Sequence, residues 1–207
     1  MHALVVFDHP YGREAHTNVP HNRSLSAALL AEALAGLAAA GHSADVIDLA
    51  ADGFDPVLSA DDLRAWRHDA AVDPRVLDYQ QRLAAADHVV FIFPTWWMSA
   101  PAATKGFLDR VLTPGFAFDE PTPGGALVRK LHSLRGVTVL TPMTTPTPLY
   151  SLWFARPGHR MLFRGTFALI GIRNLTWVTI GRSSARGASS RARVLARTRR
   201  RFARLRG

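Results

Sequence analysis

Two groups of residues in this 207-residue chain have types and spacings suited to ligand chemistry. In the first, residues 93–101, Trp96 and Trp97 stand side by side between two prolines. Adjacent side chains cannot share one face of a helix or strand, so ordinary core packing does not explain the pair. A loop at the carboxyl end of a parallel strand suits it better, because open α/β sheets bind their ligands there. The two rings therefore predict a wall for a flat aromatic ligand.

The second group lies at the start of an expected helix. Ser24 and Ser26 offer hydroxyls there, and the free N–H groups and dipole of a helix start favour an anion such as phosphate. The alternative is that Ser24 simply caps its own helix. For the tryptophans, the alternative is that one fills the core and the other lies in a protein interface.

Other chemistries can be excluded from the sequence. It contains no GxxxxGK[ST] phosphate loop, no GxGxxG after the first strand, no GxSxG and no HExxH. It has no cysteine, which excludes disulfides, thiolate zinc sites and cysteine nucleophiles. His9, His16 and His21 share one loop, but their spacing suits no regular face and no carboxylate pattern accompanies them. We therefore expect no metal site.

Short β-rich runs alternate with longer helical runs, a pattern typical of a parallel sheet covered by helices on both faces. We expect strands at residues 3–8, 44–49, 88–93, 136–141 and 176–180. We expect helices at residues 24–40, 61–68, 74–86, 101–112, 158–170 and 189–205. Residues 113–135 are expected to form a loop with a short helix near Ala126, and residues 142–157 an irregular segment. The pattern predicts one doubly wound α/β domain over residues 1–207.

The formal net charge of +9 is concentrated near the end of the chain, where residues 182–207 hold ten arginines and no acidic residue. Such a tail could contact nucleic acid or anionic lipid, but we favour a terminal helix with a solvated arginine face. We expect no nucleic acid as a partner and leave open a transient contact with a membrane surface. No basic leader and no apolar run of about 20 residues is present, so we expect a cytoplasmic protein.

In such a sheet, the loops after the first, third and fourth strands converge on the ligand crevice. Here these loops begin at His9, Pro94 and Thr141. A phosphate-binding helix start together with an aromatic wall fits a flavin, which has an anionic tail and a broad ring with polar edges. The backbone of residues 95–98 would meet those edges while Trp97 packs on the ring.

The stretch FPTWWMSAPAATKGFLDRVL at residues 93–112, continued by PGFAF at 114–118, resembles the signature of the flavodoxin-like NAD(P)H:quinone oxidoreductases. Weaker similarities at residues 54–56, 61–63 and 80–87 spread the resemblance over nearly the whole chain. It implies a flavodoxin-like three-layer sandwich with strand order 2-1-3-4-5 and a tightly bound FAD or FMN. It also implies a homodimer with active sites at the subunit interface.

The activity that the resemblance implies is two-electron, ping-pong transfer. NADH or NADPH would give a hydride to the flavin, and a quinone or similar planar acceptor would then take it in the same pocket. Three alternatives stay open, and one of them is a nucleic-acid or membrane-surface adaptor that uses the arginine tail alone. An azo- or nitro-reductase would use the same machinery, and a flavin-binding regulatory subunit of a membrane transporter would bind the cofactor without this catalysis.

The resemblance also assigns roles by position. The phosphate and ribityl end of the flavin would be held by His9, Ser24, Leu25 and Ser26, and the ring would be lined by Pro94, Thr95, Trp96, Trp97, Met98 and Thr141. Tyr150, within LYSL at residues 149–152, would stabilise charge on the reduced flavin, with His159 as the nearest candidate for its histidine partner. The alternative for Tyr150 is a buried, hydrogen-bonded core tyrosine.

One loop departs from the family pattern. The family usually has a Thr-Gly-Gly turn after the fourth strand, whereas residues 141–148 read TPMTTPTP. Proline lacks the N–H donor, so this loop is expected not to offer an equivalent row of donors to the flavin. Lys105 and Asp109 are one helical turn apart and are expected to form a surface pair rather than a catalytic one.

Overall fold

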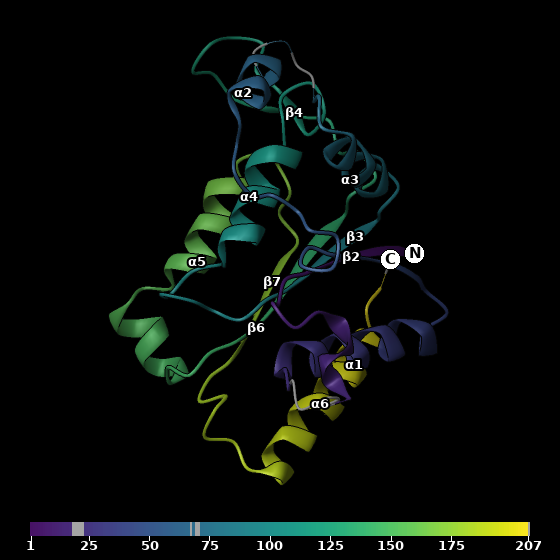
Figure 1. Cartoon of the computed structure of the whole chain (residues 1–207), viewed down its shortest axis with the longest axis vertical. Coiled ribbons are helices and arrows are strands. Elements are labelled where there is room, and N and C mark those ends of the chain that lie inside the picture. Colours follow the sequence, from purple (N-terminus) through teal and green to yellow (C-terminus); the bar gives the residue numbers. More distant parts are fainter. Residues whose placement is uncertain (18–22, 67, 69–70, 207) are drawn as a thin grey trace.

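The chain folds around a parallel sheet with helices on both faces (Figure 1). The computed structural model describes residues 1–17, 23–66, 68 and 71–206. The strand order is β2-β1-β3-β6-β7, with β1 at His2–Phe7, β2 at Ser43–Asp48, β3 at His88–Ile92, β6 at Gly136–Pro142 and β7 at Leu175–Ile180. The predicted order 2-1-3-4-5 is confirmed, because β6 and β7 are the fourth and fifth of the expected strands.

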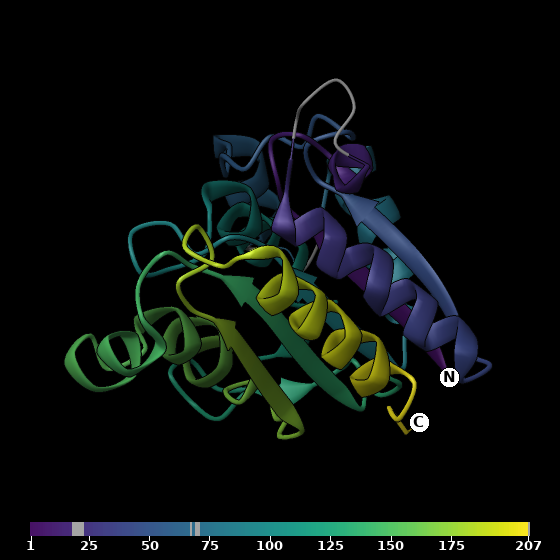
Figure 2. The same cartoon turned by 90° about the horizontal axis from the view of Figure 1, so that it is seen from below.

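Two cores lie on opposite faces of this sheet because successive side chains of a strand point in opposite directions. Along β3, Val89 and Phe91 enter one core, whereas Val90 and Ile92 enter the other. The first core is covered by α3 (Pro74–Ala84), α4 (Ala102–Val111) and the wide π-helical turns of η3 (Arg160–Phe167). The second is covered by α1 (Leu25–Ala39) and α6 (Ala188–Phe202), which lie side by side (Figure 2).

Local signals set the limits of the main helices. The Oγ atom of Ser24 accepts a hydrogen bond from the Ala27 N–H at 3.1 Å and caps α1. Gly41 follows its last turn with φ of 71°, as predicted for the residue that ends this helix. Asp73 caps α3, and Pro74 occupies the first turn, where its missing N–H costs little. Among the described residues, no helix is both long and apolar enough to cross a membrane.

Three segments differ from the prediction. The prediction of a short helix near Ala126 was wrong. Instead, β4 (Phe118–Asp119) and β5 (Val128–Arg129) pair antiparallel across a turn in which Gly124 has φ of 71°. The segment expected to be irregular contains the π-helical turn η2 (Leu149–Trp153). The helix expected near residue 158 begins as α5 (Pro157–His159) and continues as η3. The remaining short helices are η1 (Arg13–His16) and α2 (Ala60–Trp66).

Candidate functional site

A cavity of about 370 Å³ lies at the carboxyl edge of the sheet, between the loops that follow β3 and β6. It is lined by Pro94, Thr95, Trp96, Trp97, Pro142, Met143, Thr144 and Ser183. The first four were assigned to a ligand site from the sequence. Met143, Thr144 and Ser183 were not, although the first two lie in the loop expected to face the ligand. Ser183 follows β7. The sequence did not predict its place in the site, because that place depends on the pairing of β7 with β6.

The two tryptophans belong to a tight turn. The N–H of Trp96 donates to the carbonyl of Ser99, and the N–H of Ser99 donates to the carbonyl of Trp96, both at 3.0 Å. Between them, Trp97 and Met98 have φ of 45° and 64°, a left-handed backbone that costs a non-glycine residue about 1–2 kcal/mol. Trp97 is 99% exposed and Trp96 47%, so neither ring fills the core. Backbone strain beneath a solvent-facing aromatic ring is typical of a binding site.

Threonines anchor the base of this turn to β6. The N–H of Thr95 donates to the carbonyl of Pro142 at 2.9 Å, and the hydroxyls of Thr95 and Thr141 share a hydrogen bond of 2.6 Å. Thr141 is fully buried and does not line the cavity. Thr141 therefore contacts Thr95, and Thr95 in turn lines the cavity.

A carboxylate from β1 holds the other end of the loop. Asp8 Oδ2 accepts hydrogen bonds from the N–H and the hydroxyl of Thr104, at 2.8 and 2.7 Å. Thr104 lies in the first turn of α4, whose cap residue Pro101 provides no side-chain cap of its own. Burial raises the pKa of Asp8, and the two bonds from Thr104 oppose that rise. Asp8 thus caps α4 from a neighbouring strand and positions the Trp loop.

The start of α1 offers backbone groups rather than serine hydroxyls. The hydroxyl of Ser24 is used in capping the helix, Ser26 is buried, and Leu25 packs against the core. The first N–H groups of a helix have no partner within it, so those of Leu25 and Ser26 are suited to an anion. The preceding residues 18–22 lie outside the described part of the chain.

His9 is half-buried at the end of β1. Its Nδ1 atom accepts a hydrogen bond from the N–H of Tyr11 at 3.2 Å, and the two rings lie 5.3 Å apart. Burial lowers the pKa of His9, with Asp8 and Asp48 opposing that change. A neutral ring whose Nδ1 accepts carries its proton on Nε2, which suits a donor to a phosphate or hydroxyl oxygen.

The histidines of the first loop form no metal centre that the structure shows. The ring of His16 bonds to the carbonyl of Arg13 at 3.0 Å, and His21 lies outside the described residues. Within the described ranges, no group of three or more His, Cys, Asp and Glu residues could hold a metal ion.

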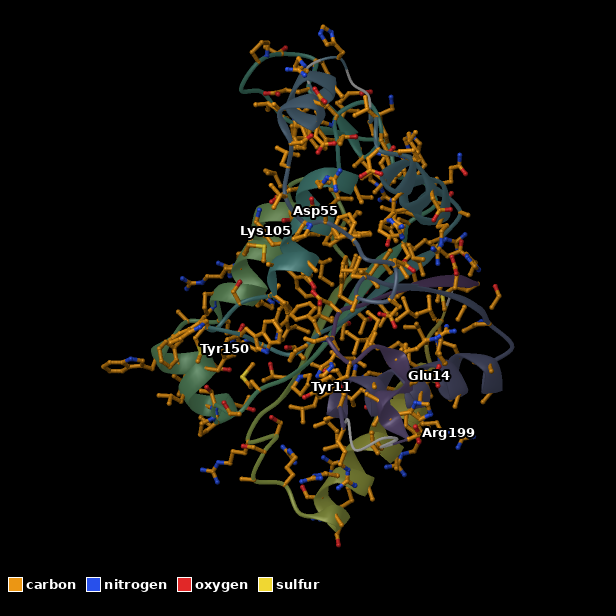
Figure 3. All side chains as sticks on the ribbon, viewed as in Figure 1. Tyr11, Glu14, Asp55, Lys105, Tyr150 and Arg199 are labelled. Carbon is orange, nitrogen blue, oxygen red and sulfur yellow. The ribbon has the colours of Figure 1, made fainter. Side chains whose placement is uncertain are left out.

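Tyr150, which Figure 3 labels, is fully buried, and no side-chain hydrogen bond of its hydroxyl is found among the described residues. It lies against Gly158, where a Cβ atom would come within 3.2 Å of the hydroxyl and 3.3 Å of the Met98 carbonyl. The N–H of Gly158 donates to that carbonyl at 3.2 Å, which links this region to the Trp turn. Burial raises the pKa of Tyr150, while the nearby N–H groups of His159 and Gly158 and the charge of Arg156 oppose the rise. Both the role in flavin binding and the alternative of a core tyrosine therefore stay predictions for Tyr150.

The ring of His159 has a different environment from the one expected. It packs against Phe163 and Trp177, with ring centroids 4.9 and 5.6 Å away. Burial and the charges of Arg156 and Arg164 lower its pKa. Its backbone N–H, rather than its ring, is the group near the Tyr150 hydroxyl.

The loop after β6 keeps part of its donor capacity despite the prolines. The N–H of Met143 bonds to the carbonyl of Ile180 at 3.0 Å, whereas those of Thr144 and Thr145 bond to no described backbone or side-chain group. The loop after β7 lies close by, because a Cβ on Gly181 would come within 2.5 Å of Thr147 Oγ1 and 2.7 Å of its nitrogen. Thr144, which lines the cavity, and its neighbour Thr145 therefore have N–H groups without a partner among the described residues. On the helix surface, Lys105 and Asp109 form the predicted ion pair.

Comparison with known proteins agrees with this architecture. A curated protein named as an uncharacterised NAD(P)H oxidoreductase of Haemophilus influenzae is 28% identical over 134 residues, 65% of each chain. The solved NAD(P)H:quinone oxidoreductase of Methanothermobacter marburgensis has a TM-score of 0.83 at 27% identity, covering 100% of this chain and 99% of that one. The FMN-dependent NADH-azoreductase of Bacillus anthracis, solved with FMN, shares the fold with a TM-score of 0.78 at 16% identity, covering 100% and 99% of the two chains.

The chain spans less than two thirds of the length of the curated relatives it matches. The family match is broader, since residues 1–205 match the Flavodoxin_2 family, described as a flavodoxin-like fold. The chain therefore belongs to the Flavodoxin_2 family, and its relatives are NAD(P)H and quinone oxidoreductases.

Proposed function

We propose that this protein is a flavin-dependent oxidoreductase that passes two electrons from NADH or NADPH, through FAD or FMN, to a quinone or similar planar acceptor. The observation that carries the proposal is the cavity beside the strained Trp turn, at the carboxyl edge of the sheet. Relatives named as NAD(P)H or quinone oxidoreductases support it, and so does a structural neighbour solved with FMN.

The residues present fit a flavin. The cavity volume lies at the lower end of the range of about 300–1,000 Å³ for ligand pockets, which suits a ring system rather than a whole flavin. Trp97 would pack on the ring, and the N–H groups of Thr144 and Thr145 would donate to its polar edge. His9 and the N–H groups of Leu25 and Ser26 would hold the phosphate end.

When bound, the flavin supplies the chemistry that accepts a hydride and passes it on. Tyrosine is protonated at neutral pH, and burial raises the pKa of Tyr150 further, so its hydroxyl would be a hydrogen-bond donor to negative charge on the ring. The backbone of His159 helps to position Tyr150, whereas the buried side of its ring stabilises the turn through Phe163 and Trp177. With the ring bound, Trp96 and Trp97 would shield part of it from water.

A second copy of the chain is proposed to complete the site. Large apolar side chains stay exposed on the Trp turn and on η2, among them Trp97 at 99%, Leu152 at 82% and Trp153 at 79%. Leu149 and Phe154 are exposed as well. A cluster of this kind is typical of an interaction surface, and its position next to the cavity supports a partner that would close the pocket.

Steady-state kinetics test the proposal. Protein loaded separately with FAD and with FMN should oxidise NADH or NADPH with a benzoquinone, and double-reciprocal plots should show the parallel lines of a ping-pong mechanism. Faster turnover with an azo dye than with any quinone would change the assigned acceptor. Bound flavin without turnover on any acceptor would contradict the enzyme and favour a regulatory flavoprotein.

A further inference from the structure

A groove of about 730 Å³ runs between α6 and the edge strand β7, on the face of the sheet that α1 and α6 cover. It is larger than the cavity at the Trp turn and shares no lining residue with it. Its lining includes six arginines and no acidic residue: Arg186, Arg197, Arg200, Arg201, Arg204 and Arg206. The groove is therefore a concentrated positive site separate from the proposed flavin pocket.

The charge of the groove is part of an uneven distribution of acidic and basic residues along the whole sequence. All 16 Asp and Glu residues lie in residues 1–120, together with eight Lys and Arg residues. Residues 121–207 contain 17 Lys and Arg residues and no acidic residue. The first part forms β2, β1 and β3, and the second forms β6 and β7, so the sheet is acidic toward its β2 edge and basic toward its β7 edge. A negatively charged partner is thereby directed to the β7 edge.

Within the described chain, the arginines of the groove are not neutralised by carboxylates. None of the observed ion pairs includes an arginine of α6. Arg186 donates to the carbonyl of Gly181 at 3.0 Å and to the hydroxyl of Ser190 at 2.9 Å, which fixes it at one end of the groove. Gathering like charges disfavours the folded state, and an external anion would relieve that repulsion.

The floor of the groove is aliphatic. Val178, Val194 and Leu205 are partly exposed there, Leu140 and Ile180 are buried beneath them, and no aromatic ring lines the groove. Single-stranded nucleic acid is usually held by bases stacked on aromatic rings, which this surface lacks. Arginines around an aliphatic floor instead match a molecule with a phosphate headgroup and a hydrocarbon body, because guanidinium groups bind phosphate in a bidentate manner.

We propose that the groove between α6 and β7 binds the headgroup and adjoining acyl chain of an anionic phospholipid and holds the protein against a membrane surface. α6 does not enter the bilayer as a free amphipathic helix, because its apolar side chains pack on the sheet and on α1. The contact is peripheral, formed by arginines and by the floor between them. It does not depend on the flavin, so it stands or falls separately from the proposed activity.

Vesicle flotation with two matched variants tests the site. Arg197→Gln with Arg201→Gln removes two charges that line the groove. Arg164→Gln with Arg199→Gln removes two exposed charges outside it, one on η3 and one on α6 (Figure 3 labels Arg199). The probes are vesicles of phosphatidylcholine alone and vesicles containing about one third phosphatidylglycerol. Circular dichroism confirms that each variant is folded.

The wild type should float with the phosphatidylglycerol vesicles and not with phosphatidylcholine alone. A basic residue at an anionic surface contributes about fivefold to binding, so the groove pair should weaken it by about 25-fold and the outside pair by less than about threefold. Arg197→Lys with Arg201→Lys keeps the charge but loses the guanidinium fork, and should weaken binding to an intermediate degree.

Three results would overturn the proposal. Equal losses in the two glutamine pairs would show that binding depends only on net charge. Inorganic tripolyphosphate that displaces the vesicles at the concentration of their anionic lipid would assign the groove to a free phosphate compound. Tighter binding of a DNA or RNA oligonucleotide than of the vesicles, lost in the groove pair, would assign it to nucleic acid.

Discussion

At the scale of single residues, Tyr150 has the least expected environment in the site. Its side chain is completely buried, yet its hydroxyl has no hydrogen-bond partner among the described residues. Leaving a buried hydroxyl unpaired costs about 1–3 kcal/mol, so this atom opposes folding. Such a cost is expected where the group serves a ligand. The sequence identified Tyr150 through family resemblance, but its lack of a partner depends on where Gly158 and Met98 lie in three dimensions.

Tyr150→Phe removes only this hydroxyl. We expect the free energy of unfolding of the flavin-free protein to rise by about 1 kcal/mol, because no unpaired group remains. We expect kcat to fall about tenfold or more, because a donor to the reduced ring is lost. Urea denaturation and steady-state kinetics measure the two effects.

Tyr79→Phe is the matched control. Tyr79 is also buried, but its hydroxyl donates to Asp52 at 2.7 Å, so this change should lower stability and leave kcat unchanged. A Tyr150→Phe protein that gains stability without losing turnover would show that the hydroxyl has no catalytic role.

At the scale of elements, the helix ends and the sheet could be predicted because their signals are local. Ser24 and Gly41 bound α1 as expected, and the apolar run at residues 88–93 forms β3. The hairpin of β4 and β5 could not be predicted from the sequence, because the pairing of Phe118 with Arg129 depends on contacts across the loop. The cap that Asp8 provides to α4 was missed for the same reason, as 96 residues separate Asp8 from Thr104.

A buried histidine between β3 and β6 predicts that the stability of the protein depends on pH. His88 begins β3, is buried, and bonds through Nε2 to Thr138 Oγ1 at 2.9 Å. Burial lowers its pKa to about 4 from an ordinary 6.5. The unfolded chain therefore binds a proton on His88 between these pH values while the folded protein does not. Stability should be lost as the pH falls through this window, by about 3 kcal/mol once His88 is protonated in both states.

His88→Gln is the variant that tests this contribution, because glutamine can keep the bond to Thr138 without titrating. Denaturation curves measured from pH 7 to pH 4 should show a steeper loss for the wild type than for the variant. Equal slopes would show that His88 does not titrate differently in the folded and unfolded states.

At the scale of the whole molecule, two surfaces remain to be filled. The arginine groove and the exposed apolar residues of the Trp turn and η2 lie on different elements, so we propose different partners for them. The positive tail was visible in the sequence, but the groove was not, because it depends on β7 lying at the edge of the sheet beside α6. The exposure of Trp153 also needed the structure, since an aromatic residue in an apolar run is often buried.

Leu152→Arg tests the proposed dimer. Leu152 is largely exposed, so the change should cost the single chain little, yet a charge in an apolar interface should convert the dimer into a monomer. Flavin affinity should fall with it, because the proposed partner would no longer close the pocket. Light scattering and flavin titration measure both. Val57→Arg, at another exposed apolar position, should leave the dimer intact. A Leu152→Arg protein that stays dimeric would move the interface elsewhere.

The central claim, that the carboxyl edge of β3 and β6 holds a flavin, is tested most directly by the visible spectrum of the purified protein and of a Trp97→Ala variant. The wild type, as isolated or after incubation with FAD or FMN and removal of excess, should be yellow, with absorption bands that shift on binding. Trp97 is fully exposed, so its loss should leave the fold intact and weaken flavin binding about tenfold. A wild-type protein that stays colourless after incubation with either flavin would contradict the claim.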